Sequence, residues 1–358
     1  MKRAVLLVLV GIASSCNGVP PAVIDAGTDD ASLDGGDLDA GLADAGETDA
    51  GSIDAGITDA GSDAGLDAGA DAGQPDAGAI DAGPDLCPVP SGVGAVFRVR
   101  AMAANLTSGS NQSYDPGEGA RIMQGADPDI VMIQEFNFGN KTPADMDTFV
   151  ARTFDGGVDG GFAYYRGVGN IPNGVISRWP IIAQGEWAGQ SPDRNLTWVH
   201  VDIPGPNDLW VISVHLPTSS AGSRDMDART IIRQLDAGIP EYDYLVLGGD
   251  LNTTNRSEAA FSTLSARFVV SGPYPADQFS NEGTNANRNK PYDNVLATPC
   301  LARRQQPSVV GTTAFAAGLV IDTRGYTPLT DLAPALQSDS AATNMQHMGV
   351  VKDFFIQP

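Results

Sequence analysis

The stretch Tyr244-Leu-Val-Leu-Gly-Gly-Asp-Leu-Asn252 decides how the rest of the chain is interpreted. Its first four residues are apolar and β-prone and two glycines close the run, so we expect a buried strand over 244–247. The glycines allow a tight turn and a close approach to the backbone. Beyond them, Asp250 and Asn252 are two residues apart, which puts both side chains on the same side of an extended chain.

The pair Asp250 and Asn252 has two interpretations. Carboxylate and carboxamide oxygens at a strand end can hold a Mg²⁺-type ion, orient a water molecule or bind a phosphate. The same two residues can equally satisfy backbone groups in a Gly-Asp-x-Asn turn. This stretch alone leaves both open, so the remainder of the chain has to decide.

The amino terminus has the pattern of an export signal. Met1-Lys2-Arg3 precedes an apolar run over 4–12 and the small residues that lead to Cys16, and this run is too short to span a membrane. Residues 1–16 resemble a bacterial lipoprotein signal, in which Cys16 is acylated and becomes the first residue. We therefore expect an exported lipoprotein of the outer membrane or cell surface, bound to the membrane through its lipid anchor only, with plain secretion as the alternative.

Residues 17–86 are a low-complexity segment of Asp-Ala-Gly units. Large apolar residues are almost absent, so the segment cannot bury a core that offsets its chain entropy. We expect a disordered, self-repelling tether. A Ca²⁺-binding β-roll is the alternative for periodic Asp-x-Gly, but the units lack the apolar position that such a roll buries.

The tether carries most of the negative charge. Residues 21–86 contain 17 acidic and no basic side chains, which leaves 27 acidic and 19 basic side chains, a net charge of −8, in residues 87–358. A domain of this charge without a basic block is not suited to tight non-specific binding of nucleic acid by charge alone. Binding of a phosphate through a metal ion is still compatible with it.

Residues 87–358 are long enough for one large α/β domain. Cys87 and Cys300 are its two cysteines. In an exported protein they indicate one disulfide that ties the start of the domain to a later strand, with two free thiols as the alternative. The widely spaced cysteines and histidines form no zinc motif.

Several expected strands of this domain end in polar side chains. The runs 97–105, 129–135 and 209–216 are apolar or alternating and carry Asn105, Glu135 and His215 at or near their ends. A further strand over 291–297 has Asp293 near its start, and one over 347–355 begins at His347. The carboxyl ends of strands are where open α/β sheets usually place their chemistry.

The remaining elements are a helix over about 118–126, paired strands over 195–203 and 209–216, and an amphipathic helix over about 224–237. The last of these is expected to place its apolar side, which includes Met226, in the core. Residues 173–181 predict two strands joined at Trp179-Pro180, and Arg178 beside this turn either contacts a phosphate or braces the turn through carbonyl groups.

The order of these polar strand ends resembles that of the endonuclease/exonuclease/phosphatase family, of which pancreatic-type deoxyribonuclease is the best-known member. The matching pieces span nearly all of 95–358 and are Ala103-Ala-Asn105, Asp129-Ile-Val-Met-Ile-Gln-Glu135, Ser213-Val-His-Leu216, Gly248-Gly-Asp-Leu-Asn252, Tyr292-Asp-Asn-Val-Leu296 and Gln346-His347. The resemblance implies a four-layer α/β sandwich, in which two facing mixed β-sheets are flanked by helices.

The resemblance also implies roles for the catalytic residues. Asp250 and Asn252 orient the water and the phosphate. His347 takes a proton from the attacking water, and Asp293 holds its imidazole in the correct tautomer. His215 hydrogen-bonds the phosphate or assists the leaving oxygen.

For the metal, the resemblance implies Mg²⁺, with Mn²⁺ or Ca²⁺ as alternatives. Glu135 is its main ligand and Asn105 and Gln346 lie beside it. The family usually has an Asp where this chain has Gln346, which brings no negative charge to a cation. Asp339, a little upstream, is a candidate to compensate for that loss.

These features predict an exported Mg²⁺-dependent phosphodiester hydrolase, first of all a nuclease acting on DNA or RNA. A phospholipid or sphingomyelin phosphodiesterase or a phosphatase of the same family is the runner-up. A non-catalytic surface module of the same fold is the third hypothesis, and Gln346 is its only support. No protein partner is evident, and we expect a monomer.

Overall fold

The computed structural model describes residues 87–88, 94–154, 156–157 and 161–357. The expected export signal with Cys16 and the expected tether over 17–86 lie outside the described residues. Within the described ranges, no helix combines the length and the apolar character needed to cross a membrane.

The first sheet combines parallel and antiparallel strands in the order β10-β14-β1-β2-β4-β3, and β13 pairs with β14 outside this path. β1 and β2 are parallel, and the other neighbours are antiparallel. The strands are β1 (Phe97–Ala104), β2 (Ile130–Ile133), β3 (Ala163–Arg166), β4 (Gly174–Ser177), β10 (Gln305–Gln306), β13 (Leu319–Ile321) and β14 (Gly349–Ile356).

The second sheet has the order β5-β6-β7-β8-β9, and β11 and β12 form a separate two-stranded hairpin. β7 and β8 are parallel and the other pairs are antiparallel. Its strands are β5 (Ile181–Trp187), β6 (Leu196–Val201), β7 (Leu209–His215), β8 (Tyr244–Asp250) and β9 (Asp293–Ala297), and the hairpin consists of β11 (Ser308–Val310) and β12 (Thr313–Phe315).

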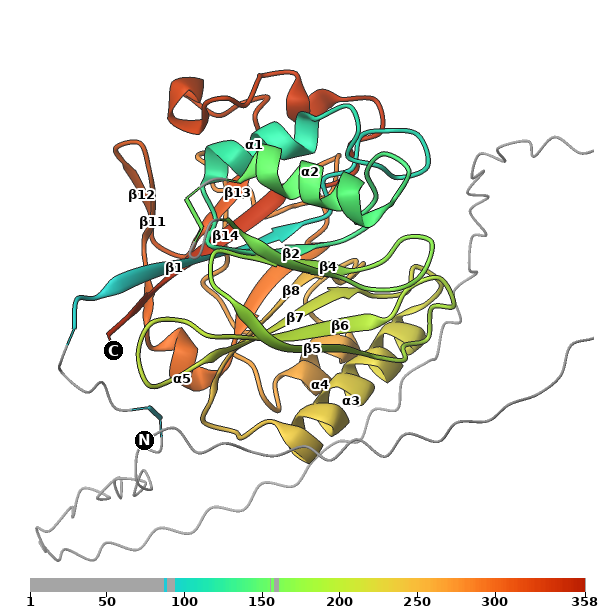
Figure 1. The fold of residues 1–358 in the computed structure, drawn as a ribbon, viewed down its shortest axis with the longest axis vertical. Coiled ribbons are helices and arrows are strands. Elements are labelled where there is room, and N and C mark those ends of the chain that lie inside the picture. The colour runs from blue at the N-terminus through green and yellow to red at the C-terminus, as the bar shows by residue number, and fades with distance from the viewer. Residues whose placement is uncertain (1–86, 89–93, 155, 158–160, 358) are drawn as a thin grey trace, which may run out of the picture. The chain divides into compact units, whose positions relative to one another are not determined.

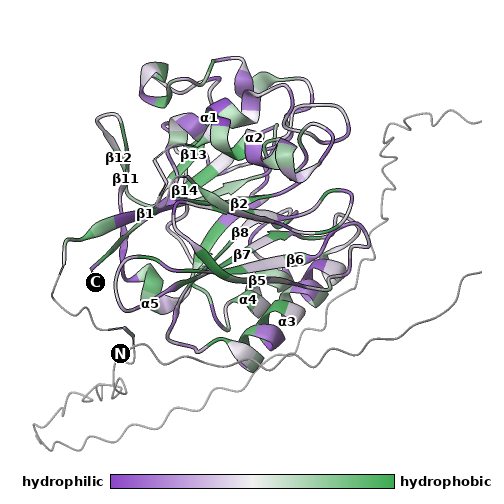
Figure 2. Cartoon of the chain, viewed as in Figure 1, coloured by the Kyte–Doolittle hydropathy of each residue, from purple (hydrophilic) through white to green (hydrophobic). Residues whose placement is uncertain are grey.

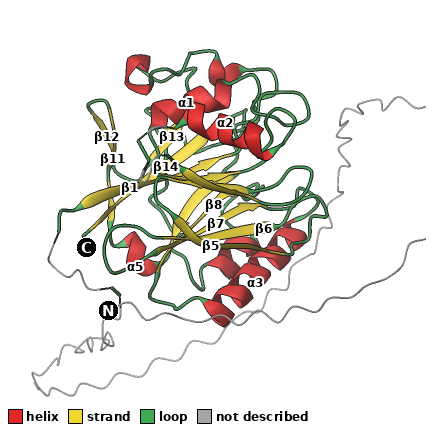
Figure 3. Cartoon of the chain, viewed as in Figure 1, coloured by secondary structure: helices red, strands yellow, loops and turns green. Residues whose placement is uncertain are grey.

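Helices cover the outer faces of both sheets (Figures 1 and 3). α1 (Glu118–Ala126) and α2 (Pro143–Thr153) pack on the first sheet, and α3 (Ala221–Gly238) and α4 (Ala259–Leu264) pack on the second. The shorter helices are α5 (Pro299–Ala302), η2 (Leu329–Leu332) and η3 (Asp339–Ala341).

The inner layer between the sheets is a continuous apolar core (Figure 2). Alternate residues of the central strands point into it, as the period of two in the sequence predicts. They include Val99, Ala101, Ala103 and Met132 from the first sheet, and Val199, Val211, Val246 and Val295 from the second. With the helices outside, this arrangement confirms the predicted four-layer α/β sandwich.

The tight turn expected at the two glycines of β8 is absent, whereas the expected close approach to the backbone is present. The strand does not end at Leu247 but continues to Asp250. A Cβ atom at Gly248 would lie 2.6 Å from the Cε atom of Met132 in β2, and one at Gly249, where φ is +131°, would collide with the backbone oxygen of Val214. The glycines therefore let the facing sheet and the neighbouring strand approach the end of β8.

Cys87 and Cys300 form a disulfide with an S–S distance of 2.00 Å. The expected pairing is present, but Cys300 lies in α5, directly after β9, and not in a strand. The disulfide thus closes the start of the domain onto the second sheet.

The prediction that Met226 lies on the core-facing side of α3 is wrong, since 46% of its surface is exposed. The buried face of α3 instead includes Arg224, paired with Glu258 at 2.8 Å, and Asp227, which accepts a hydrogen bond from the backbone of Gln190. Polar residues with partners can occupy a buried helix face, and a count of apolar residues cannot detect this.

Replacing Gly249 by Ala should lower the free energy of unfolding by about 3 kcal/mol. The added Cβ atom meets the backbone of β7 and the positive φ disfavours a side chain. Urea unfolding of the full chain measures the change. Gly238→Ala is the matched control, because no atom lies within 4 Å of its Cβ position; equal stability of the two variants would contradict the packing described here.

Candidate active site

The candidate site lies at one edge of the two facing sheets. Asn105 and Glu135 follow the carboxyl ends of the parallel strands β1 and β2, and His215 and Asp250 end the parallel strands β7 and β8. The strand register pairs His215 directly with Asp250. Parallel strands bring their carboxyl ends to the same edge, so residues far apart in sequence meet here.

One oxygen of Asp250 is the centre of this group. Its Oδ2 lies 3.1 Å from Nδ2 of Asn105, 3.3 Å from Nε2 of His215, 3.3 Å from Nδ2 of Asn252 and 3.4 Å from Nε2 of His347. Its Oδ1 accepts a hydrogen bond from the backbone N–H of Asn252. Asp250 is 1% exposed, so these donors replace the water that a buried carboxylate loses.

His347 is held by a second carboxylate on its other ring nitrogen. Its Nδ1 lies 2.9 Å from Oδ2 of Asp293, and the backbone N–H of Asp293 donates to the Thr284 hydroxyl at 2.7 Å. The chain around His347 also bridges to Asn285 in the same loop. The ring is therefore fixed between Asp293 and Asp250, with Nε2 directed toward Asp250.

The electrostatics of the site follow from burial and from these contacts. Burial alone lowers the pKa of His347, but the carboxylates of Asp293 and Asp250 outweigh it and raise the pKa to about 10. Burial raises the pKa of Asp250 to about 7, against the opposing effect of the His347 charge. The pKa of His215 is lowered well below its usual value by burial and by the positive charges of Arg194 and His347. Of the two histidines in the site, His215 is therefore the neutral one.

Glu135 faces the same space from the first sheet. Its Oε2 accepts a 2.5 Å hydrogen bond from the hydroxyl of Thr107, and its Oε1 lies 4.0 Å from Nδ1 of His215. Glu135 and Asn252 both have a left-handed backbone with φ of 52°. Such strained conformations cluster at functional sites because the surrounding structure has to maintain them.

Unpartnered polar atoms show where a cation fits. Oδ1 of Asn105 and Nδ1 of His215 are buried and make no hydrogen bond, and the Glu135 carboxylate has its Oε1 directed to the same side. Oxygen donors of this kind are the ligands that Mg²⁺, Mn²⁺ and Ca²⁺ accept. Glu135 and Asn105 are therefore suited to hold a divalent ion.

A second group of possible ligands consists of Asp250, Asp293 and His347, whose donor atoms lie within 4.8 Å of one another. A metal ion there would compete with the hydrogen bond between Nδ1 of His347 and Asp293. That bond is short and buried. Asp250, Asp293 and His347 are therefore a second candidate position for a divalent ion, beside the group around Glu135.

The structure does not bring Gln346 or Asp339 into the site. Gln346 is exposed, because neighbouring residues of an extended chain point to opposite sides and His347 points inward. Asp339 is buried elsewhere, in an ion pair with Arg121 at 2.6 Å. The expected contribution of Gln346 to the metal site, and the compensation by Asp339, therefore find no support in the geometry.

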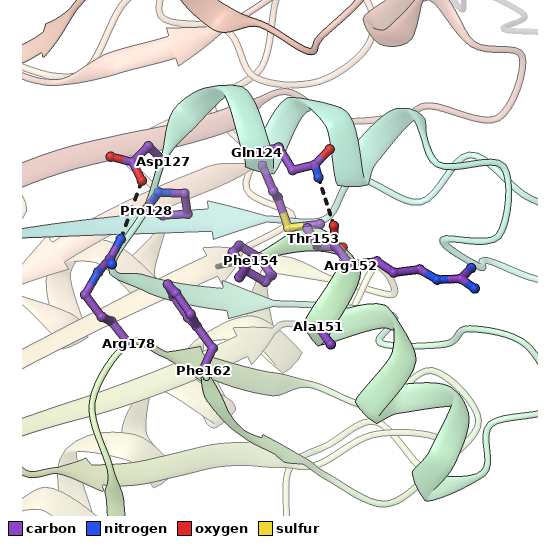
Figure 4. A pocket seen from close by; sticks show the side chains of 10 residues that line it. Gln124, Asp127, Pro128, Ala151, Arg152, Thr153, Phe154, Phe162 and Arg178 are labelled. Atoms are coloured by element: carbon purple, nitrogen blue, oxygen red, sulfur yellow. Dashed lines mark hydrogen bonds and ion pairs between the residues drawn. The ribbon is translucent and has the colours of Figure 1, made fainter. Parts of the chain in front are cut away.

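Arg178 also lies away from the site, so the expected phosphate contact is wrong and the bracing role holds. It binds Asp129 at 2.6 Å and the backbone oxygen of Gly156 at 2.9 Å. Asp129 precedes β2 whereas Glu135 follows it, so the two lie at opposite ends of the strand. Figure 4 shows Arg178 beside Asp127 in a hollow of about 340 Å³ near the ends of α1 and α2.

Sequence patterns did not reveal the residues that hold the functional side chains in place. Thr107 and Thr284 are such supports, and so is Ser213, which accepts a hydrogen bond from Gln134 and donates one to the backbone of Ile133 in the facing sheet. The sequence offered one signal for these supports, namely that Thr107 follows the predicted metal ligand Asn105 by two residues. Their partners come from other strands, which a single sequence does not specify.

An Asp-paired histidine that faces carboxylate and carboxamide oxygens, at one edge of a four-layer sandwich, defines a hydrolytic type of site. Residues 117–324 match the model of the endonuclease/exonuclease/phosphatase family. The chain therefore belongs to this family, whose members are mostly hydrolases that act on phosphoester bonds. Among curated proteins, no sequence matches this chain.

Solved structures to which this chain is similar include three bacterial proteins. An endonuclease/exonuclease/phosphatase from Beutenbergia cavernae is 21% identical, with a TM-score of 0.44 over 72% of this chain and 71% of that chain. A protein of the same description from Bacteroides vulgatus is 16% identical, with a TM-score of 0.48 over 73% and 100%. A functionally unknown conserved protein from Enterococcus faecalis is 14% identical, with a TM-score of 0.49 over 73% and 100%.

Asp293→Asn should lower the pKa of His347, because it removes the carboxylate that raises this pKa most. In the wild type, the raised pKa of His347 also stabilises the folded state. This stabilisation is fully present below the unfolded pKa of about 6.5 and is lost as the pH rises toward 10. NMR titration of the imidazole signals measures the shift, and His200→Gln helps to assign the three histidines. An unchanged His347 titration would contradict the assignment of Asp293.

Proposed function

We propose that the chain is an exported, Mg²⁺-dependent phosphodiesterase that cleaves nucleic acid. The observation that carries the proposal is the convergence on Asp250 of His347, His215 and Asn105 from different strands and loops. Family membership supports the hydrolysis of phosphate esters. Mg²⁺ and a nucleic acid substrate are the finer parts of the proposal.

Glu135 and Asn105 would hold the metal, which when bound neutralises charge that develops on the phosphate. His347 is mostly protonated at neutral pH in the metal-free site, where its pKa is about 10. In the fraction of molecules in which it is neutral, it takes a proton at Nε2 from a water molecule that Asp250 orients. Asp293 accepts the Nδ1–H hydrogen bond and stabilises the imidazolium that forms. The water oxygen forms a bond to phosphorus, and the bond from phosphorus to the leaving oxygen breaks. The leaving oxygen keeps the electron pair of this bond and takes up a proton from solvent water.

His215 and Asn252 have supporting roles in this scheme. The low pKa of His215 keeps it neutral, so its single ring N–H can donate one hydrogen bond, to Asp250 or to the phosphate, and it does not act as a strong acid. Asn252 uses its amide group on Asp250 and on the backbone oxygen of Leu216. Asn252 therefore acts on the phosphate indirectly, through the position of Asp250.

Removal of the base should abolish most of the activity. His347→Ala should reduce kcat/KM on DNA or RNA by about 10²–10⁴-fold, the usual contribution of a general base, and excess EDTA should abolish the wild-type activity. His200→Ala is the matched control, because His200 stacks on Trp210 away from the site. Activity that survives both His347→Ala and EDTA would refute the mechanism.

The substrate class is tested by the same preparation on DNA, RNA, sphingomyelin and bis(p-nitrophenyl) phosphate. Cleavage of a nucleic acid supports the proposal. Cleavage of sphingomyelin alone would favour the phospholipid phosphodiesterase, and hydrolysis of none of them would favour a non-catalytic module.

Thr107→Val should weaken metal binding about tenfold, since groups that orient metal ligands commonly contribute 10- to 100-fold to affinity. The substitution keeps the shape of the side chain but removes the hydrogen bond to Glu135. Mn²⁺ titration followed by electron paramagnetic resonance measures the affinity. Thr107→Ser should restore it, and wild-type affinity in Thr107→Val would contradict the orienting role.

Export rests on the signal pattern over 1–16 and is supported by the disulfide between Cys87 and Cys300, a bond typical of oxidising compartments. With an intact signal, the protein should appear in the membrane fraction of a bacterial host. Cys16→Ser should move it to a soluble exported fraction. A Cys16→Ser variant that stays in the membrane fraction would contradict a lipid anchor at this residue.

A further inference from the structure

The loop that precedes β9 carries a lysine next to the candidate base. The ring of Tyr292 lies 5.7 Å from the ring of His347, centre to centre. Nζ of Lys290 lies 3.4 Å from the Tyr292 hydroxyl and 5.6 Å from the centre of its ring. The ammonium group is therefore nearer to the hydroxyl than to the face of the ring.

The charge of Lys290 is available, unlike that of the arginines in the neighbouring loops. Arg256 is paired with Glu282, Arg288 with Asp322, and Arg324 also with Asp322. Within the described part of the chain, no carboxylate lies within 4.0 Å of the Lys290 ammonium group. In a domain with a net negative charge, an unneutralised cation beside the site attracts an anion.

The backbone of Lys290 is fixed to the same loop that holds His347. Its N–H donates to Oδ1 of Asn285 at 2.9 Å, and its carbonyl accepts from the N–H of Thr284 at 2.8 Å. Asn285 bridges to His347, and Thr284 accepts the hydrogen bond from Asp293. The backbone of Lys290 is thus held at a constant position relative to the candidate base, and its ammonium group reaches the Tyr292 hydroxyl at 3.4 Å.

We propose that Lys290 and the Tyr292 hydroxyl form a subsite for a second phosphate group of a polynucleotide, next to the phosphate that reacts. An ammonium group and a phenol hydroxyl 3.4 Å apart can both donate to one phosphate oxygen. The Tyr292 ring lies 5.7 Å from the ring of His347, centre to centre, so the subsite lies beside the candidate base and serves the neighbouring phosphate. This inference rests on the proposed function and specifies its substrate as a chain of phosphodiesters.

The direct test is binding of a short fluorescent oligothymidylate in EDTA, which prevents cleavage, over a range of NaCl concentrations. Lys290→Met should weaken binding about fivefold. It should also reduce the slope of log Kd against log NaCl by about 0.7, the value for one phosphate contact on a single strand. Tyr292→Phe should weaken binding less, and Lys290→Arg should retain most of it.

Arg229→Met is the matched control, because it removes the same charge from an exposed position on α3. It should change neither the affinity nor the slope. A second readout compares substrates: Lys290→Met should raise KM for the oligonucleotide and leave the hydrolysis of bis(p-nitrophenyl) phosphate, which has one phosphate, unchanged.

Three results would overturn the subsite. The first is equal affinity of wild type and Lys290→Met for the oligonucleotide. The second is a loss of activity in Lys290→Met that is as large on bis(p-nitrophenyl) phosphate as on the oligonucleotide. The third is binding that depends on Lys290 only when phosphatidylglycerol vesicles replace the oligonucleotide. Oligonucleotide binding that depends on Lys290, in a protein that hydrolyses no phosphodiester, would support the subsite while refuting the proposed catalytic function. The two proposals can therefore fail separately.

Discussion

The fold of this site depends on the burial of one carboxylate. Asp250 is almost fully removed from water, and a buried charge is stable only when polar partners replace its hydration. Four side-chain nitrogens converge on its Oδ2, from Asn105, His215, Asn252 and His347. The need to satisfy Asp250 therefore couples both sheets and the final loop to a single point.

The two sheets are built to allow this convergence. Gly248 and Gly249 let β2 and β7 approach the end of β8, where a side chain would collide. The Tyr114 hydroxyl donates to the backbone oxygen of Ala104 and accepts from the N–H of Leu106 around the end of β1. These contacts fix the carboxyl ends of β1, β2, β7 and β8, so the functional residues at or directly after these ends take their positions from strand packing.

Much of this architecture was predictable from local patterns. Apolar runs closed by polar residues located the ends of β1, β2 and β7 within two residues, because period-two burial and strand breakers act within a few residues. The strand β8 continues three residues beyond its predicted end at Leu247. The resemblance to the family then supplied the relation between these ends, which local patterns cannot. The pairing of His347 with Asp293, 54 positions away, is of this second kind.

The failures have a common physical cause. Met226 was assigned to the core and Gln346 to the metal, and a phosphate contact was one of two roles considered for Arg178, because each residue type suits that role. Their actual environments are set by partners from distant segments, such as Asp129 for Arg178. Thr107 was missed for the same reason, since its importance comes only from its contact with Glu135.

The position of the metal relative to Asp250 tests this account most directly. Anomalous diffraction from crystals soaked with Mn²⁺ and inorganic phosphate should place the ion about 2.0–2.6 Å from the Glu135 carboxylate and Oδ1 of Asn105. The phosphate should lie within hydrogen-bonding distance of His215, and the bond between His347 and Asp293 should remain. An ion bound instead by Asp250, Asp293 and His347, with that bond broken, would contradict the separation of metal binding from proton transfer.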